Sequence, residues 1–389
     1  MDVRSLLKVM VDQEASDLYL TVDSPPAYRI HGSTQRTDAP PFTNEQLEAL
    51  ALALMRGQQR GEFEEKMEMN LALYYKELGR FRVNVFRQRG NIGLVFRHIK
   101  AEIQSADQLG LPPIVKDISM TKRGLVLVVG ATGSGKSTTL AAMIDHRNSI
   151  HPGHIVTVED PIEFVHNHKR SLITQREVGF DTLSFQNALR NTLRQAPDVI
   201  LIGEIRDTET MEAAITFAET GHLCIGTLHS NNANQAIERI MNFFPVERHA
   251  QIYLQLSLNL RAIISQRLIP SIDGKRAPAL EIMTDTPRIK DLIKKAEIDS
   301  LKEAMEQGVQ EGCQTFDYVL FNLYKDERIT LEQALINADS ANNLRLKIKL
   351  EGLKGDEAVN ALLDKKSGDS SGGAFKIQGG AGGGPLRKL

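Results

Sequence analysis

The spacing of apolar residues in the first hundred positions alternates between that of a helix and that of a strand. Residues 3–22 carry apolar side chains first at helical spacing and then at every second position, which predicts a helix followed by a strand. Thr43 and Gln46 form a capping box, which predicts the start of an amphipathic helix. From residue 69 to residue 99 the period is two, as expected of paired strands. We therefore expect a small α+β domain over residues 1–100.

The apolar pattern then changes to short, wholly apolar strands that alternate with helices. Such strands are typical of a doubly wound parallel sheet, which is covered on both faces. Later the spacing becomes purely helical, and the end of the chain is rich in glycine and serine, too poor in apolar side chains to offset the entropy of ordering. The predicted divisions are a linker at 101–116, an α/β core at 117–286, a helical subdomain at 287–350 and a mostly flexible tail at 351–389.

Composition excludes several classes of protein. The formal net charge is only −2, so no overall basic field points to nucleic acid as a partner. The two cysteines, Cys224 and Cys313, are far apart in sequence, which excludes a thiolate zinc site and a disulfide framework. The longest apolar run, residues 125–131, is much shorter than the roughly 20 residues that cross a bilayer. We expect a soluble, cytoplasmic protein that could dock on a membrane complex.

The most specific motif follows the first apolar strand of the α/β core. Leu125-Val-Leu-Val-Val129 leads into Gly130-Ala-Thr-Gly-Ser-Gly-Lys-Ser137, with a predicted helix directly behind it, and this context is that of a phosphate-binding loop. In such a loop glycines turn backbone N–H groups toward phosphate oxygens, lysine reaches the terminal phosphates and the serine hydroxyl binds Mg²⁺. The sequence therefore predicts a site for ATP and Mg²⁺ that comprises Gly130, Ala131, Thr132, Gly133, Ser134, Gly135, Lys136, Ser137 and Thr138.

Three later apolar strands are each followed by a polar residue of a suitable type: Glu163, Glu204 and His229. Because ligands bind at the carboxyl ends of strands in such sheets, we expect these side chains to gather around the nucleotide. One carboxylate would hold Mg²⁺, and the other would orient or deprotonate the attacking water. His229 stands where a sensor of the γ-phosphate would sit. Taken singly, each acid is equally well explained as a solvated loop residue or a helix N-cap, and the histidine as a structural residue.

Arginines follow the paired strands of the first domain. Alternation places Arg80 and Arg82 on the face opposite the apolar residues, and Arg97 lies on the next strand. These arginines form either a solvated basic face or groups that complete the nucleotide site of a neighbouring subunit. The second domain offers Arg190 and Arg194, but their spacing is also that of an ordinary helix face. Arg82 and Arg97 suit a contribution in trans better.

The motifs together resemble those of the secretion ATPases that drive type II secretion and type IV pili. Glu159-Asp-Pro-Ile-Glu163 is similar to the aspartate box of that family, Leu201-Ile-Gly-Glu-Ile-Arg-Asp207 to its Walker B motif, and Thr220-Gly-His222 through Thr227-Leu-His-Ser230 to its histidine box. The order and spacing of these boxes behind the phosphate loop are specific. The similarity extends from the N-terminal region to about residue 350.

This resemblance implies a fold and a set of roles. It implies a hexameric ring in which a PAS-like N-terminal domain packs on a RecA-like P-loop domain. It also implies that Glu163 is the catalytic base, that Glu204 is the Walker B acid on the Mg²⁺ side, and that Arg82 and Arg97 are candidates for contacts between subunits.

Within the family, the chain resembles the branch that retracts pili. The assembly branch is longer and carries a four-cysteine zinc module. A box of the retraction branch, Ala-Ile-Arg-Asn-Leu-Ile-Arg-Glu, aligns here with Arg288-Ile-Lys-Asp-Leu-Ile-Lys-Lys295, in which lysine replaces both arginines and the glutamate. Lysine does not reproduce the bidentate fork of arginine. This departure and the glycine-rich tail resemble the accessory paralogue of the branch rather than its principal motor.

The resemblance implies an ATPase motor, or accessory motor, that acts at the inner face of the inner membrane. Its expected partners are further copies of the chain, the platform protein of the pilus in the inner membrane and a paralogous retraction ATPase, with no nucleic acid. Two other functions stay open. The chain could form a weakly hydrolysing ring that braces a partner ATPase, or a related engine for type II secretion or DNA uptake.

Overall fold

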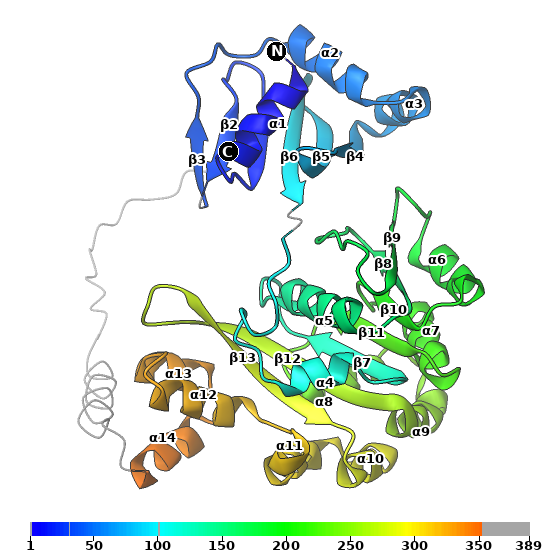
Figure 1. Cartoon of the computed structure of the whole chain (residues 1–389), viewed down its shortest axis with the longest axis vertical. Coiled ribbons are helices and arrows are strands. Elements are labelled where there is room, and N and C mark those ends of the chain that lie inside the picture. The colour runs from blue at the N-terminus through cyan, green and yellow to red at the C-terminus, as the bar shows by residue number, and fades with distance from the viewer. Residues whose placement is uncertain (1, 31, 100–101, 352–389) are drawn as a thin grey trace, which may run out of the picture.

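The computed structural model of the chain describes residues 2–30, 32–99 and 102–351. It contains a six-stranded sheet, named the N-terminal sheet, and a seven-stranded sheet, named the core sheet. The two sheets lie one above the other in Figure 1. Nearly all of the predicted tail at 351–389 lies outside the described residues. No helix among the described residues is long and apolar enough to cross a membrane.

The N-terminal sheet is antiparallel, in the order β3-β2-β1-β6-β5-β4. Its elements are α1 Val3–Asp12, β1 Asp17–Leu20, β2 Ala27–Ile30, β3 Ser33–Arg36, α2 Asn44–Leu54, α3 Gly57–Lys66, β4 Glu68–Tyr75, β5 Gly79–Gln88 and β6 Asn91–Ile99. The predicted capping box of Thr43 and Gln46 opens α2. The strand predicted to reach Val22 ends at Leu20, and Val22 makes only an isolated bridge to Phe42.

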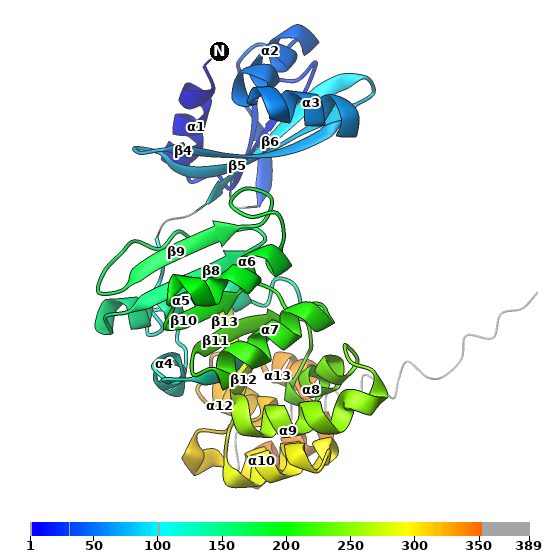
Figure 2. The ribbon, with the colours of Figure 1, turned by 90° about the vertical axis from the view of Figure 1, so that its right-hand side faces the viewer.

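One face of the N-terminal sheet carries its hydrophobic core. On β5, Phe81, Val83 and Val85 are fully buried and alternate with half-buried Arg80 and Arg82, because successive side chains of a strand point to opposite faces. All three helices pack on the apolar face. Figure 2 shows the helices above this sheet and strand β9 of the core sheet below it. The face that bears the arginines is therefore turned toward the core sheet.

The core sheet has the order β13-β12-β7-β11-β10-β8-β9, with β13 the antiparallel strand. Its strands and the helices between them are α4 Ile114–Ser119, β7 Gly124–Val129, α5 Lys136–Ile150, β8 His154–Glu159, β9 Leu172–Glu177, α6 Phe185–Thr192, β10 Val199–Ile202, α7 Thr208–Glu219, β11 Leu223–Leu228, α8 Ala233–Met241, α9 His249–Asn259, β12 Leu260–Pro270 and β13 Arg276–Thr284. Short 3₁₀ turns follow α6 at Leu193–Gln195 and α8 at Val246–Arg248.

Helices cover both faces of the core sheet. Leu125, Leu127 and Val129 of β7 join one hydrophobic cluster, whereas Val126 and Val128 join a second cluster on the opposite face. A strand buried on both faces must be apolar at every position, as this one is. The structure therefore confirms the predicted doubly wound α/β fold with an α+β unit in front of it.

Helices complete the C-terminal part: α10 Pro287–Lys294, α11 Leu301–Gln307, α12 Phe316–Lys325, α13 Leu331–Asn337 and α14 Ala341–Leu350, with 3₁₀ turns at Ile298–Ser300 and Val309–Glu311. The first two of these helices share a hydrophobic core with α7 and α9. The last three form a separate cluster on the far end of the β12–β13 hairpin, where Phe316 and Leu320 meet Ile269 and Ala279. The hairpin thus connects the core sheet with the C-terminal helices.

Candidate functional site

The phosphate-binding loop connects β7 to α5 and lies against β12. Gly130, directly after β7, has φ +154°, and a Cβ atom there would lie 2.6 Å from the carbonyl oxygen of Gln266. Gly135, with φ +88°, caps α5, and its Cβ would lie 2.8 Å from the side-chain nitrogen of Gln266. Both backbone conformations and both close approaches require glycine. The two glycines of the motif therefore allow the loop to adopt this backbone conformation and to pack closely against Gln266.

The polar groups of this loop fit a phosphate ligand. Lys136 Nζ donates to the carbonyl oxygens of Gly130 at 2.8 Å and Ala131 at 3.0 Å, which leaves one of its three donors for a ligand. Burial lowers the pKa of Lys136, and nearby Glu204 and Glu163 oppose that shift. The buried Ser134 hydroxyl has no hydrogen-bond partner among the described residues. Both groups suit the oxygens of a nucleotide phosphate.

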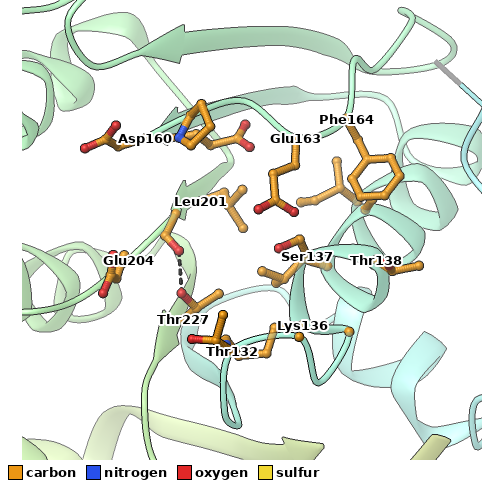
Figure 3. Close-up of a pocket in the computed structure, with 18 of the residues that line it drawn as sticks. Thr132, Lys136, Ser137, Thr138, Asp160, Glu163, Phe164, Leu201, Glu204 and Thr227 are labelled. Carbon is orange, nitrogen blue, oxygen red and sulfur yellow. Dashed lines mark hydrogen bonds between the residues drawn. The ribbon is translucent and has the colours of Figure 1, made fainter. Parts of the chain in front are cut away.

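The carboxyl ends of the parallel strands surround a cavity of about 510 Å³. In Figure 3 the Glu163 carboxylate points across this cavity toward Ser137, and Glu204 lies on the opposite side. Of the predicted residues, those that line the cavity are Thr132, Gly133, Gly135, Lys136, Ser137, Thr138, Glu163, Glu204 and His229. Gly130, Ala131 and Ser134 line an adjoining cavity of about 220 Å³.

The ends of β10 and β11 are held together beside the phosphate loop. His229 Nε2 lies 3.5 Å from Glu204 Oε1, and the Thr227 hydroxyl donates to the carbonyl oxygen of Gly203 (Figure 3). Each of these contacts joins the end of one strand to the end of its neighbour. The sequence indicated the two charged residues, but it gave no sign that they would pair with each other.

Glu159, the last residue of β8 and the first of the aspartate box, was given no role of its own from the sequence. Its carboxylate accepts hydrogen bonds from the Thr157 hydroxyl at 2.6 Å and from Gln175 at 3.3 Å. Burial raises the pKa of Glu159 to about 7, against the lowering effect of those hydrogen bonds. Because Glu159 also lines the cavity, it is a titratable group at the site near neutral pH. Its position at the end of an apolar strand could have predicted from the sequence that it lies at the site.

Residues of β12 and β13 also reach the site, and sequence analysis missed them. The Thr139 hydroxyl of α5 donates to Gln266 at 2.7 Å, and Leu268 and Arg276 line the main cavity. A further cavity of about 180 Å³ beside Gly135 has apolar walls, among them Leu109, Leu111, Leu268 and Pro278. Apolar walls next to a phosphate loop suit the flat base of a nucleotide. The signal in the sequence was the polar run Ser265-Gln-Arg267, which follows the apolar residues Ala262-Ile-Ile264 of the same strand.

The arginines of the N-terminal sheet line none of these cavities. Arg82 and Arg97 lie opposite each other on β5 and β6. Arg97 Nε donates to Oδ1 of the buried Asp17 at 2.9 Å, although the arginine side chain is still 64% exposed. Arg80 instead forms an ion pair with Glu177 of the core sheet, with Nη2 3.0 Å from Oε2. Within one chain, therefore, the structure does not bring Arg82 or Arg97 to the phosphate loop.

Residues 5–342 match the sequence model of the family described as "Type II/IV secretion system protein". The chain belongs to this family. It is 51% identical over 351 residues to the type IV pilus ATPase PilU of Pseudomonas aeruginosa, a match that covers 90% of this chain and 92% of the relative. It is 44% identical over 343 residues to the retraction ATPase PilT of the same organism, which covers 88% of this chain and all of the relative.

A solved structure is also similar to this chain. The crystal structure of the pilus retraction motor PilT with bound ADP superposes with a TM-score of 0.82 at 42% identity, and the match covers 87% of this chain and 98% of that one. Fold, family and site therefore agree that this protein is a nucleotide-binding ATPase of the secretion family. The identity to PilU is greater than the identity to PilT, as expected from the altered box at residues 288–295 and the glycine-rich tail.

Proposed function

We propose that this ATPase drives the retraction of type IV pili, and thereby twitching motility, as a motor or accessory motor. The observation that carries the proposal is the complete set of phosphate loop, aspartate box, Walker B and histidine box around one cavity, in a chain similar along most of its length to PilU and PilT. Residues 1–100 are proposed to act as the moving domain, joined by a linker at 101–116 to the ATPase core.

Each residue of the site has a proposed role. The loop from Gly130 to Thr138 binds the phosphates, and Mg²⁺ would be held by the Ser137 hydroxyl and, directly or through water, by the Glu204 carboxylate. There it would neutralise negative charge on the phosphates. Glu163, whose carboxylate faces Ser137 in Figure 3, acts as the base toward the attacking water. His229 reports the presence of the γ-phosphate to Glu204, its neighbour at 3.5 Å.

The proposed assembly is a homohexameric ring on the cytoplasmic face of the inner membrane. The arginines of the N-terminal sheet support it, because Arg97 is exposed, Arg82 is half-buried, and neither lines the cavities described around the phosphate loop. The proposed partners are the platform protein of the pilus and a paralogous retraction ATPase.

A second function is favoured by the altered box at residues 288–295. Lys290 pairs with Asp285 and Lys295 with Asp291, each at 2.7 Å, and Arg288 Nη2 lies 3.5 Å from Glu303. Three of the four basic residues of the box, Arg288, Lys290 and Lys295, thus pair with acids within the same chain. Basic side chains that already pair within the chain are less available for contacts that hydrolysis requires. This suits a ring that braces a partner ATPase and hydrolyses ATP weakly.

Complementation tests the two functions against each other. Cells that lack this protein would receive the unchanged chain or Lys136→Ala, and pilus retraction would be recorded by microscopy together with ATP hydrolysis by the purified rings. A motor requires Lys136 for retraction. If Lys136→Ala restores full retraction, the chain acts as a brace. If neither form affects retraction but secretion or DNA uptake responds, the related engine is correct.

A further inference from the structure

The loop that carries Glu163 is fixed by side chains of β9 on both sides of that residue. The N–H of Ile162 donates to Glu177 Oε2 at 3.3 Å. The carbonyl oxygen of Phe164 accepts from Gln175 Nε2 at 2.9 Å, and the N–H of His166 donates to the same Gln175 at 2.8 Å. Glu163 itself is exposed. Its position therefore depends on the anchors of its two neighbours.

Glu177 differs from Gln175 because it also contacts the N-terminal sheet. The same Oε2 atom that accepts from Ile162 accepts from Arg80 Nη2 at 3.0 Å. Glu177 is only 1% exposed, and its own N–H donates to Asp181 at 2.8 Å, which fixes the end of β9. One buried oxygen thus links a strand of the N-terminal sheet to the residue next to the proposed base.

Electrostatics make this link sensitive to the position of Arg80. Burial raises the pKa of Glu177, whereas Arg80, the N–H of Ile162 and Arg82 lower it, and Asp181 adds a smaller upward effect. A buried carboxylate that loses its cation is left uncompensated, which is costly. When the N-terminal sheet moves away, Glu177 must therefore take up a proton, turn toward water or find another donor.

We propose that Glu177 is a positioning residue through which Arg80 holds the loop of Glu163, so that the loop is ordered only while the N-terminal sheet is docked on β9. The proposal rests on the role of Glu163 as base given above. It couples the two sheets within one chain: docking aligns the base, and undocking releases it. A displacement of about 1 Å in a catalytic group can cost on the order of 100-fold in rate, so a modest loosening is sufficient.

Kinetics of full-length variants test the link. Arg80→Ala should lower kcat about 10-fold with little change in the KM for ATP, since the phosphate loop is untouched. Glu177→Ala should lower kcat further, because it also frees Ile162. The double variant should match Glu177→Ala alone, as expected of two residues that act through one contact. Arg80→Lys should recover part of the rate, and Arg36→Ala, an exposed arginine of β3, should leave kcat unchanged.

Hydrogen exchange supplies a readout that does not depend on hydrolysis. A peptide that spans residues 159–166 should exchange faster in Arg80→Ala and Glu177→Ala than in the unchanged chain or Arg36→Ala. Glu177→Gln keeps both the shape and an acceptor, so it should exchange at an intermediate rate if the fold is intact. Unchanged exchange in Arg80→Ala, or additive losses of kcat, would overturn the proposal. Full activity of Glu163→Gln would instead show that Glu163 is not the base. Hydrogen exchange would still decide whether Arg80 and Glu177 order the loop.

Discussion

The N-terminal sheet and the core sheet differ in how many of their faces are covered. Helices cover one face of the N-terminal sheet, and the other face of β5 therefore tolerates polar side chains such as Arg80 and Arg82. Both faces of the core sheet are covered, so its central strands are apolar along their length and polar residues occur where strands end. A sheet covered on one face can offer a flat contact surface, whereas a sheet covered on both faces concentrates its chemistry at one edge.

The sharpest test of chemistry at strand ends is Glu163→Gln. Removal of the base should lower kcat by about 10²–10⁴-fold, while ATP stays bound because the phosphate loop is intact. Glu204→Gln should instead weaken the binding of ATP with Mg²⁺. Calorimetry with Mg²⁺ present, together with steady-state hydrolysis, distinguishes the two carboxylates. Loss of ATP binding in Glu163→Gln would mean that the two roles are exchanged.

Lys136→Ala should lower hydrolysis by about 10²–10³-fold, since a preorganised cation is lost from the developing charge on the phosphate. The melting temperature without nucleotide should hardly change, because burial of the ammonium already works against its charged form. Lys66→Ala is the matched control, since Lys66 is an exposed lysine of α3 paired with Glu62. A rate in Lys136→Ala equal to that of the control would refute the assignment of the nucleotide site.

Two adjacent residues of β5 test the difference between the faces of the N-terminal sheet. Phe81 is fully buried and stacks on His98 with ring centroids 5.0 Å apart, so Phe81→Ala should destabilise the fold by about 3–5 kcal/mol. Arg82→Ala, on the opposite face, should change stability by no more than about 0.5 kcal/mol. Thermal unfolding of the two variants provides the measurement. Equal losses would show that the arginine face is itself part of a packed interface.

The smallest expected effect is the recovery of activity on mixing subunits. If Arg82 or Arg97 completes the site of a neighbour, rings mixed from inactive Arg82→Ala or Arg97→Ala and inactive Lys136→Ala should regain part of the activity, because some interfaces then pair an intact arginine with an intact loop. Hydrolysis by mixed rings is compared with that of each parent. Mixed rings that assemble normally but remain inactive would leave these arginines as a solvated basic face.

Features encoded by neighbouring residues could be read from the sequence. The residues of the capping box, Thr43 and Gln46, lie within a few positions of one another, and so do the residues of the phosphate loop. The placement of Glu163 and Glu204 around one cavity follows from the geometry of parallel strands. Contacts between distant segments could not be read. Arg80 and Glu177 are 97 positions apart, and hydrophobic spacing gives the face of a strand but not its partner across a domain boundary.

The same limit applies to the partners that neutralise charge. Arg97 was interpreted as a group free to act in trans, yet it donates to Asp17, 80 positions earlier, because β1 and β6 are adjacent in the N-terminal sheet. Strand order decides this contact. An antiparallel order such as β1-β6-β5 depends on packing of the whole unit, which the local pattern of a strand does not contain.

The strand order of the core sheet has a consequence for synthesis on the ribosome. β7, which leads into the phosphate loop, has β11 and β12 as its neighbours, and β12 extends from Leu260 to Pro270. Long-range pairing of this kind is slow and cannot begin before both strands exist. A nascent chain therefore cannot form a competent nucleotide site until translation has passed β12. The strand order therefore places completion of the nucleotide site late in translation.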